Sequence, residues 1–287
     1  MSRTYLALLH YDGRAFAGWQ RQPEVRTVQG EVERVLERLC GSRIVANAAG
    51  RTDAGVHAAG MGVSLEMPER WEAEALHRAL NGLLPADCWV ERVSEMAPGF
   101  HARWRATGRR YRYEVGTDPA SASPFRRGFE WALGRELDGG RLVEAAAVLP
   151  GRHSFEAFSV RQEKAPVIDG GGGAQIHPCG IRTRPYALGP YECTIGLARW
   201  EIRPEGQGFR FHVAADRFLH HMVRFLVGTM VEIGLGRRPV EDMVTLLRTT
   251  DNCGTSQPAP AEGLYFQAAS YPEECYLQTA EAVSDGR

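Results

Sequence analysis

The sequence of 287 residues lacks any paired cysteine motif. Its six cysteines are scattered, and the closest two, Cys179 and Cys193, stand 14 positions apart. This spacing argues against a zinc ribbon, and a chain of this length does not need a disulfide framework. We therefore expect reduced thiols in a cytoplasmic protein that uses no metal and no cofactor.

Long apolar runs and an excess of one charge are also missing. No run approaches the roughly 20 apolar residues of a membrane-spanning helix. The run from Tyr5 to Leu9 is too short for a signal peptide and is followed at once by His10 and Asp12. The formal net charge is -1, so the protein as a whole has no positive field that would indicate a nucleic-acid partner. We expect no membrane association and no protein partner, and any RNA site must be a local basic patch.

Hydrophobic residues make up 44% of the chain, which suits one large domain or two closely joined ones. Alternating and helical periodicities predict a mixed α/β chain. Strands are expected at 3–11, 44–46, 61–65, 110–115, 192–202 and 208–213, and helices at 28–40, 71–83, 138–149 and 216–234. The second part repeats the first in outline, so we expect two halves, 1–115 and 116–287, that form one catalytic unit.

The stretch from Ala49 to Ala58, AGRTDAGVHA, is the most distinctive part of the sequence. Its place between two strand-like runs predicts a loop presented by a strand. Asp beside Gly is most often a turn signal and nothing more. Here Arg51, Asp53 and His57 crowd one short loop and offer an anion-binding group, a nucleophile or base, and a titratable ring. Asp53 is therefore the candidate reactive group.

The helix predicted at 216–234, with Asp216 as its N-cap, contains one misplaced charge. Arg224 stands among apolar residues, and burial of an unpaired cation is costly. It needs a partner, and Asp53 is the obvious candidate. His220 and His221 are adjacent and not four positions apart, so they do not form a metal pair on one helix face, and we assign them a structural role.

Two segments place arginines among aromatic residues, which suits RNA because rings stack on bases while guanidinium groups meet phosphates. In the loop at 14–26 the alternative, a surface loop with one buried tryptophan, stays open. Residues 101–112, HARWRATGRRYR, contain no acid, and here we favour RNA binding over a solvated face. The arginines that we assign to RNA are Arg14, Arg21, Arg103, Arg109 and Arg110.

The segment GRTDAGVHA resembles the catalytic loop of the TruA family of tRNA pseudouridine synthases. Other segments are similar to that family in the same order along the chain. They are YDG at 11–13, FAGWQRQ at 16–22, TVQGEVE at 27–33, FHAR at 100–103, RRYRY at 109–113, FLHHMVR at 218–224 and EGLYF at 262–266. The resemblance covers most of the chain.

This resemblance implies an α/β (α+β) fold of two related halves, with a central, mostly antiparallel sheet, helices on one face and a basic RNA-binding cleft. It implies isomerisation of uridine to pseudouridine in the anticodon stem-loop of tRNA, at positions 38, 39 and 40. The partner is then tRNA, bound by a homodimer.

The resemblance also implies roles for single residues. Asp53 is the nucleophile, Tyr111 lies over the uracil, and Arg224 keeps the Asp53 carboxylate charged. Arg51 holds the flipped nucleotide or fills its place, and Leu264 walls the base pocket. We place His57 with these substrate-binding residues.

One segment departs from the family pattern, because residues 161–190 are longer and richer in glycine than the connection expected there. Gly170 to Gly173 are not followed by the GK[ST] of a phosphate loop, so we expect a flexible insertion. His177 and Cys179 within it form no paired metal motif.

Two other functions were weighed. A non-catalytic RNA-binding protein or chaperone on the same fold is the alternative, and intact Asp53, Tyr111 and Arg224 count against it. An aspartic protease needs two D[ST]G loops, but Asp53 is followed by Ala54 and has no second copy.

Overall fold

A computed structural model describes residues 2–160 and 189–277 of the chain. The expected insertion, with Gly170 to Gly173, His177 and Cys179, therefore lies almost entirely outside the described residues. Within the described part, no helix is long and apolar enough to cross a bilayer. The five cysteines that this part contains are all free thiols.

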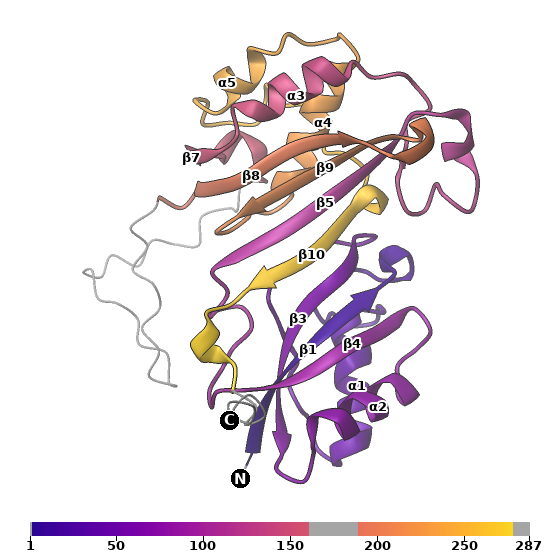
Figure 1. Cartoon of the computed structure of the whole chain (residues 1–287), viewed down its shortest axis with the longest axis vertical. Coiled ribbons are helices and arrows are strands. Elements are labelled where there is room, and N and C mark those ends of the chain that lie inside the picture. Colours follow the sequence, from indigo (N-terminus) through magenta and orange to yellow (C-terminus); the bar gives the residue numbers. More distant parts are fainter. Residues whose placement is uncertain (1, 161–188, 278–287) are drawn as a thin grey trace, which may run out of the picture.

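A ten-stranded sheet forms the framework of the molecule, and the central, mostly antiparallel sheet that the resemblance implied is confirmed (Figure 1). Eight strands follow the order β4-β1-β3-β10-β5-β9-β8-β7, while β2 pairs with β3 and β6 pairs with β5. The strands are β1 (Ser2–Tyr11), β2 (Asn47–Ala48), β3 (His57–Pro68), β4 (Cys88–Met96), β5 (Gly108–Gly116), β6 (Trp131–Ala132), β7 (Gly151–Ser154), β8 (Glu192–Ile202), β9 (Gly208–Ala215) and β10 (Leu264–Ser270). The helices are α1 (Val28–Cys40), α2 (Ala73–Leu83), α3 (Gly139–Ala147), α4 (Met222–Gly234) and α5 (Asp242–Leu246).

Most strand pairs are antiparallel, and the exceptions are β10 with β3 and β5 with β6. The last strand, β10, lies between β3 and β5, so the end of the chain joins its early part to its middle (Figure 1). Leu264 at the start of β10 pairs with Tyr113, and Phe266 pairs with Tyr111. The segments that resemble the family therefore meet at the centre of the sheet.

Local sequence signals explain α1. Thr27 has an extended backbone, and its hydroxyl accepts a hydrogen bond from the backbone N–H of Gly30, as an N-cap does. Gly41 ends the helix in the left-handed region, and its N–H donates to the carbonyl of Glu37. The apolar positions, among them Val28, Val32 and Leu36, are buried. This helix was predicted correctly from its caps and its spacing.

Several predicted boundaries were wrong, three of them near the candidate loop or by more than one residue at a helix start. The short strand before the candidate loop is Asn47–Ala48 and not residues 44–46. Helix α2 begins at Ala73, after Trp71. Helix α4 begins at Met222, because the Asp216 carboxylate accepts hydrogen bonds from the N–H groups of Thr194 and Arg217 and caps no helix.

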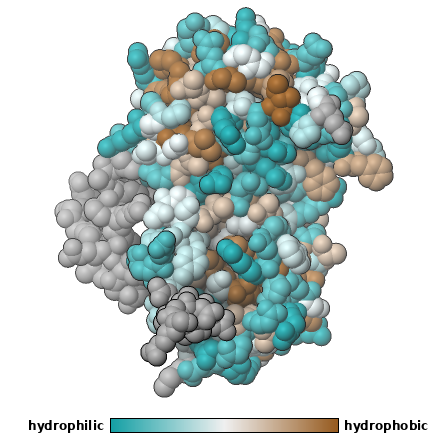
Figure 2. All heavy atoms as spheres, in the orientation of Figure 1, coloured by the Kyte–Doolittle hydropathy of each residue, from teal (hydrophilic) through white to brown (hydrophobic). Residues whose placement is uncertain are grey.

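The helices α1, α2 and α4 lie behind the strands in Figure 1, which leaves the near face of the sheet uncovered by them. On the covered side, the Trp200 indole N–H of β8 donates to the sulfur of Met230 in α4. Figure 2 shows polar residues over most of the near face, with apolar residues gathered toward the top of the molecule and in a smaller group in its lower half. This distribution is typical of a sheet that buries one face against helices.

Candidate active site

Asp53 lies on a tight loop that joins β2 to β3. The loop starts where the Ala49 N–H donates to the Gly62 carbonyl, and it closes where the Val56 N–H donates to the Asp53 carbonyl. Gly55, with a φ of 79°, makes this turn because other residues rarely adopt that conformation. The Asp53 side chain stays 28% exposed, so it remains open to solvent and to a substrate.

The neighbouring Thr52 fixes the loop from both sides. Its hydroxyl lies 2.7 Å from the Tyr11 phenol oxygen at the end of β1, and its carbonyl accepts from the Trp19 N–H. Gly18 has to be glycine here, since a Cβ would stand 2.6 Å from the Thr52 carbonyl oxygen. The YDG and FAGWQ segments thus hold the loop that carries Asp53.

The turn before α4 and the first turn of this helix bring three side chains to Asp53. His221 has a left-handed backbone, with φ of 62°, so it precedes the helix. His221 Nε2 lies 3.2 Å from Asp53 Oδ2, and His220 Nε2 lies 3.4 Å from Asp53 Oδ1. Arg224 Nη1 lies 3.7 Å from Oδ2, while its Nε donates to the Ala259 carbonyl at 2.7 Å. One carboxylate thus faces one guanidinium and two imidazoles.

The partner expected for Arg224 is therefore in place, and its side chain is 16% exposed. The role assigned to the two histidines was incomplete, because both are site residues that the sequence analysis missed. The argument assumed that they lie within a helix, where neighbours point apart. His220 and His221 instead lie in a turn before the helix, where neighbouring side chains can point the same way. No signal in the sequence predicts the left-handed backbone of His221.

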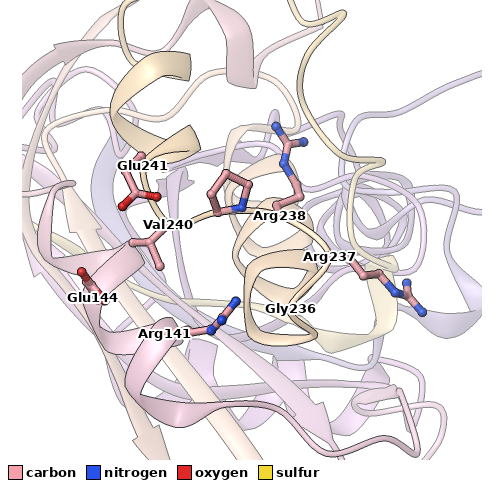
Figure 3. A pocket seen from close by; sticks show the side chains of 8 residues that line it. Arg141, Glu144, Gly236, Arg237, Arg238, Val240 and Glu241 are labelled. Carbon is pink, nitrogen blue, oxygen red and sulfur yellow. The ribbon is translucent and has the colours of Figure 1, made fainter.

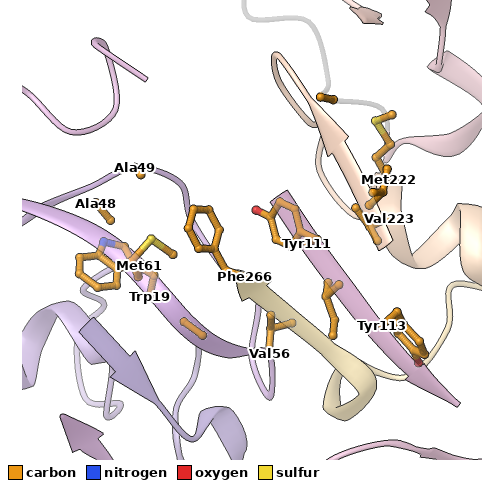
Figure 4. Close-up of a cluster of buried hydrophobic side chains, with 14 of the residues drawn as sticks. Trp19, Ala48, Ala49, Val56, Met61, Tyr111, Tyr113, Met222, Val223 and Phe266 are labelled. Atoms are coloured by element: carbon orange, nitrogen blue, oxygen red, sulfur yellow. The ribbon is translucent and has the colours of Figure 1, made fainter. Parts of the chain in front are cut away.

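Tyr111 lies beside this group of residues and is only 8% exposed. Its ring makes edge contacts with Phe218 and Phe266, at centroid distances of 4.9 and 5.1 Å. Figure 4 shows Tyr111 and Phe266 between the loop at Ala49 and the start of α4. Burial raises the pKa of the Tyr111 phenol well above its ordinary value, so at neutral pH the group is an uncharged donor.

Arg109, which we predicted to bind RNA, directs its guanidinium at the backbone of the protein itself. Its nitrogens donate five hydrogen bonds to the backbone carbonyls of Ala49, Arg103, Ala106 and Asp216, at 2.7–3.2 Å. Ala49 belongs to the loop before Asp53, Arg103 to the FHAR segment and Asp216 to the connection before α4, while Ala106 lies three residues after FHAR. Arg109 therefore positions the three segments that build the site.

His57, which we predicted to bind substrate, is buried and connects loops within the protein. It is 2% exposed, and its ring stacks on Tyr265 and Phe129. The Gly13 N–H donates to Nδ1, and Nε2 lies 3.1 Å from the Gly128 carbonyl oxygen. Burial lowers the His57 pKa, with Asp12 opposing that shift, so the ring is a neutral link between loops.

The other predicted residues differ in how far they are free to bind. Arg14 makes a bidentate pair with the carboxylate of Asp12, and Arg21 Nη1 lies 3.3 Å from Glu33 Oε2. Arg51, Arg103 and Arg110 are exposed. The Arg110 side chain lies on the face of β5 opposite to that of Tyr111, since neighbouring side chains on a strand point to alternate faces. Leu264 is buried, 6% exposed, at the start of β10.

Two hollows lie apart from these residues. One, of about 490 Å³, is lined by Arg141, Arg237 and Arg238 between α3 and the residues after α4 (Figure 3). Its arginines pair with Asp138, Glu232 and Asp242, so their charge is already balanced. A second, of about 300 Å³, is lined by His101 and Trp104. Neither contains Asp53.

Comparison with known proteins gives one consistent result. The family model described as tRNA pseudouridine synthase matches residues 7–104 and 145–272. The tRNA pseudouridine synthase A of Thermus thermophilus is 39% identical over 273 residues, which are 95% of this chain and 98% of the relative. The enzyme of the same name from Geobacillus kaustophilus is 36% identical over 97% of this chain and 98% of its own. That from Chromobacterium violaceum is 37% identical over 94% and 93%.

Proposed function

Because the chain belongs to the tRNA pseudouridine synthase family and is an isomerase of that kind, we propose that Asp53 is its nucleophile and the anticodon stem-loop of tRNA its substrate. Positions 38, 39 and 40 are the proposed target uridines. The observation that carries this proposal is the Asp53 carboxylate, partly exposed on a fixed loop, with Arg224 at 3.7 Å.

The reaction is an isomerisation, so it needs no oxidant and releases no by-product. The bond from ribose C1′ to uracil N1 breaks, the base turns, and a bond from C1′ to C5 forms. The proton leaves C5 and a proton joins N1, so atoms and electrons balance. Asp53 serves as the nucleophile, because a carboxylate can form a covalent intermediate that divides one difficult step into two easier ones.

Arg224 keeps that carboxylate ionised when a base covers it. Covering a carboxylate disfavours its charged form, and an adjacent guanidinium opposes this effect. The bond from Arg224 Nε to the Ala259 carbonyl holds the guanidinium in place while Nη1 faces Asp53. The arrangement therefore stabilises a charged nucleophile in a site closed by RNA.

The target uridine has to leave its stack, at a cost of a few kcal/mol. Stacking on Tyr111 would return roughly 1–3 kcal/mol. Leu264, whose strand pairs with that of Tyr111, walls the base pocket, and the exposed Arg51 holds the flipped nucleotide or fills its place. As an uncharged phenol, Tyr111 contributes a ring and a hydrogen-bond donor at neutral pH.

A basic cleft would hold the rest of the tRNA. Arg51 and Arg103 are exposed and suit phosphate contacts in this cleft. Arg110 is exposed on the face of β5 opposite to Tyr111, so it would contact phosphates only outside the cleft. Arg14 and Arg21 would have to bind phosphate while they stay paired with Asp12 and Glu33. We further propose that two copies of the chain bind one tRNA, in the cytoplasm, and that residues 1–115 and 116–287 act as one unit.

Mapping of the product tests this function. Unmodified tRNA is incubated with the protein, and pseudouridine is located by sequencing. We expect it at positions 38, 39 or 40, and not in a tRNA whose three target uridines are replaced by cytidines. Modification elsewhere would contradict the anticodon proposal, and tight RNA binding without modification would favour the non-catalytic RNA-binding protein.

A further inference from the structure

Three side chains at the centre of the site are good metal ligands. One ligand atom from each of Asp53, His220 and His221 lies within 4.8 Å of the other two. Two imidazoles and one carboxylate are typical of catalytic zinc sites, where three protein ligands leave one position open. We propose that these residues bind Zn²⁺ or a similar divalent transition-metal ion, and that the bound ion blocks the Asp53 carboxylate.

The spacing of the ligand atoms fits a tetrahedral ion. Bonds of about 2.0–2.2 Å to nitrogen and oxygen place two ligands of such an ion roughly 3.4 Å apart. His220 Nε2 lies 3.4 Å from Asp53 Oδ1, and His221 Nε2 lies 3.2 Å from Asp53 Oδ2, so each imidazole has this spacing to a different oxygen of the same carboxylate. The centroids of the two imidazole rings lie 4.1 Å apart, and the ring planes are tilted by 42°. The rings are therefore close enough for a rotation of the side chains to direct both nitrogens toward one ion.

The backbone makes this arrangement possible for adjacent histidines. Within a helix, neighbouring side chains point about 100° apart, which is why the sequence argued against a metal pair. His221 instead has a φ of 62° and lies before the helix, so both rings turn toward Asp53.

Access and charge set the expected affinity. His220 is 51% exposed, so an ion enters from solvent and keeps room for a water ligand. Arg224 acts against the site, because its guanidinium lies 3.7 Å from Asp53 Oδ2 and repels a second cation. We therefore expect weaker binding than at a structural zinc site, and tighter binding in Arg224→Gln.

Blocking follows from the chemistry of the carboxylate. An ion bound to Asp53 draws electron density from the carboxylate, which makes it a weaker nucleophile, and the ion occupies space beside the carboxylate that the uridine needs. The blocking step rests on the proposed role of Asp53, whereas metal binding does not. The two parts therefore need separate measurements.

Binding is tested on the full chain without RNA, by calorimetry with Zn²⁺ and by visible absorption with Co²⁺. We expect one ion per chain and a tetrahedral Co²⁺ spectrum. His220→Gln, Asp53→Asn and His221→Asn should each weaken binding by about tenfold or more, since even outer ligand partners have effects of this size. Asparagine is chosen at 221 because it tolerates a left-handed backbone.

The matched control is His10→Gln, which removes a common histidine–carboxylate pair. His10 Nε2 lies 2.9 Å from Glu91 Oε2 on the surface, outside the three-ligand group. We expect this variant to bind the ion as the wild type does. Equal affinity in wild type, His220→Gln and His221→Asn, or the absence of a tetrahedral Co²⁺ spectrum, would overturn the proposed site.

Inhibition is measured as uridine isomerisation with increasing Zn²⁺, each variant relative to its own zinc-free rate. We expect Zn²⁺ to inhibit the wild type, EDTA to restore the rate, and His220→Gln to require about tenfold more Zn²⁺. Bound zinc without inhibition would overturn the blocking step. A protein that binds zinc but isomerises no uridine in its absence would contradict the proposed function and leave the metal site standing.

Discussion

Arg224 uses separate nitrogens of one guanidinium for two tasks, and this distinguishes it from a lysine. Nε donates to the Ala259 carbonyl, while Nη1 faces Asp53. A lysine ammonium is a compact charge that cannot hold both positions. We expect Arg224→Lys to lower kcat at least about tenfold, which is 1.4 kcal/mol in the barrier, with tRNA affinity nearly unchanged.

Steady-state kinetics and a filter-binding assay measure these two quantities separately. Arg103→Lys is the control, because there an exposed arginine that we propose to contact phosphate is replaced by another cation. Full activity of Arg224→Lys would remove the guanidinium geometry from the explanation of the site.

Arg109 gives a second prediction at this scale. Its five hydrogen bonds join the loop before Asp53, the FHAR segment and the turn before α4. Arg109→Ala leaves these carbonyls without their donors, so we expect the free energy of unfolding to fall by roughly 2–4 kcal/mol. Urea unfolding measures the loss, and kcat should fall more than tRNA affinity.

The neighbouring Arg110 is the matched control for Arg109. It is exposed and points from the other face of β5. Arg110→Ala should leave stability within about 0.5 kcal/mol of the wild type. If Arg109→Ala weakened tRNA binding while stability and kcat stayed unchanged, the phosphate role first predicted for it would be restored.

At the residue scale, the sequence predicted types of chemistry better than places. Asp53 and Arg224 could be paired because a buried arginine among apolar residues needs a partner. Arg109 and Arg110 looked alike, because only the register of β5 shows which guanidinium faces the site. His57 looked like a binding group because it shares a loop with Asp53, yet β3 begins at His57 and carries it inward.

Among the elements, α1 allows a direct test of its start signal. The Thr27 hydroxyl accepts from the Gly30 N–H, and Thr27 is almost fully buried. Thr27→Ala should lower the free energy of unfolding by about 1 kcal/mol, and Thr27→Ser should retain most of it. Thermal unfolding of both variants measures this, and an equal loss in the two would show that packing of the methyl group outweighs the cap.

Element prediction worked where one segment contains its own signals. The caps and spacing of α1 and the alternation of β1, β8 and β9 are local properties. The predicted start of α4 was wrong because Asp216 resembles an N-cap, while its carboxylate accepts a hydrogen bond from Thr194 of the neighbouring strand β8. The place of β10 between β3 and β5 depends on pairing across the whole chain, which periodicity does not show.

At the scale of the whole molecule, His57 links distant parts of the chain. Its ring connects Gly13 near β1 with Gly128 and stacks on Tyr265 of β10. Burial lowers its pKa below the ordinary value of 6.5. As pH falls through 6.5, the unfolded chain therefore binds a proton that the folded chain does not, and stability falls with it.

We expect the free energy of unfolding to decrease between about pH 7.5 and pH 5.5, and to decrease less in His57→Gln. Glutamine can still accept from Gly13 and donate to Gly128, but it does not titrate. Urea unfolding at both pH values gives the comparison. An equal decrease in both proteins would assign the pH dependence to other groups.

The central claim is that Asp53 performs the chemistry, and one experiment tests it most directly. Unmodified tRNA carrying tritium at uracil C5 is incubated with the wild type and with Asp53→Asn, because isomerisation exchanges that hydrogen with water. We predict release by the wild type alone, with both proteins binding the tRNA equally well. Equal release of tritium from both proteins would contradict the account, because cleavage of the C5–H bond of uracil would then not depend on Asp53.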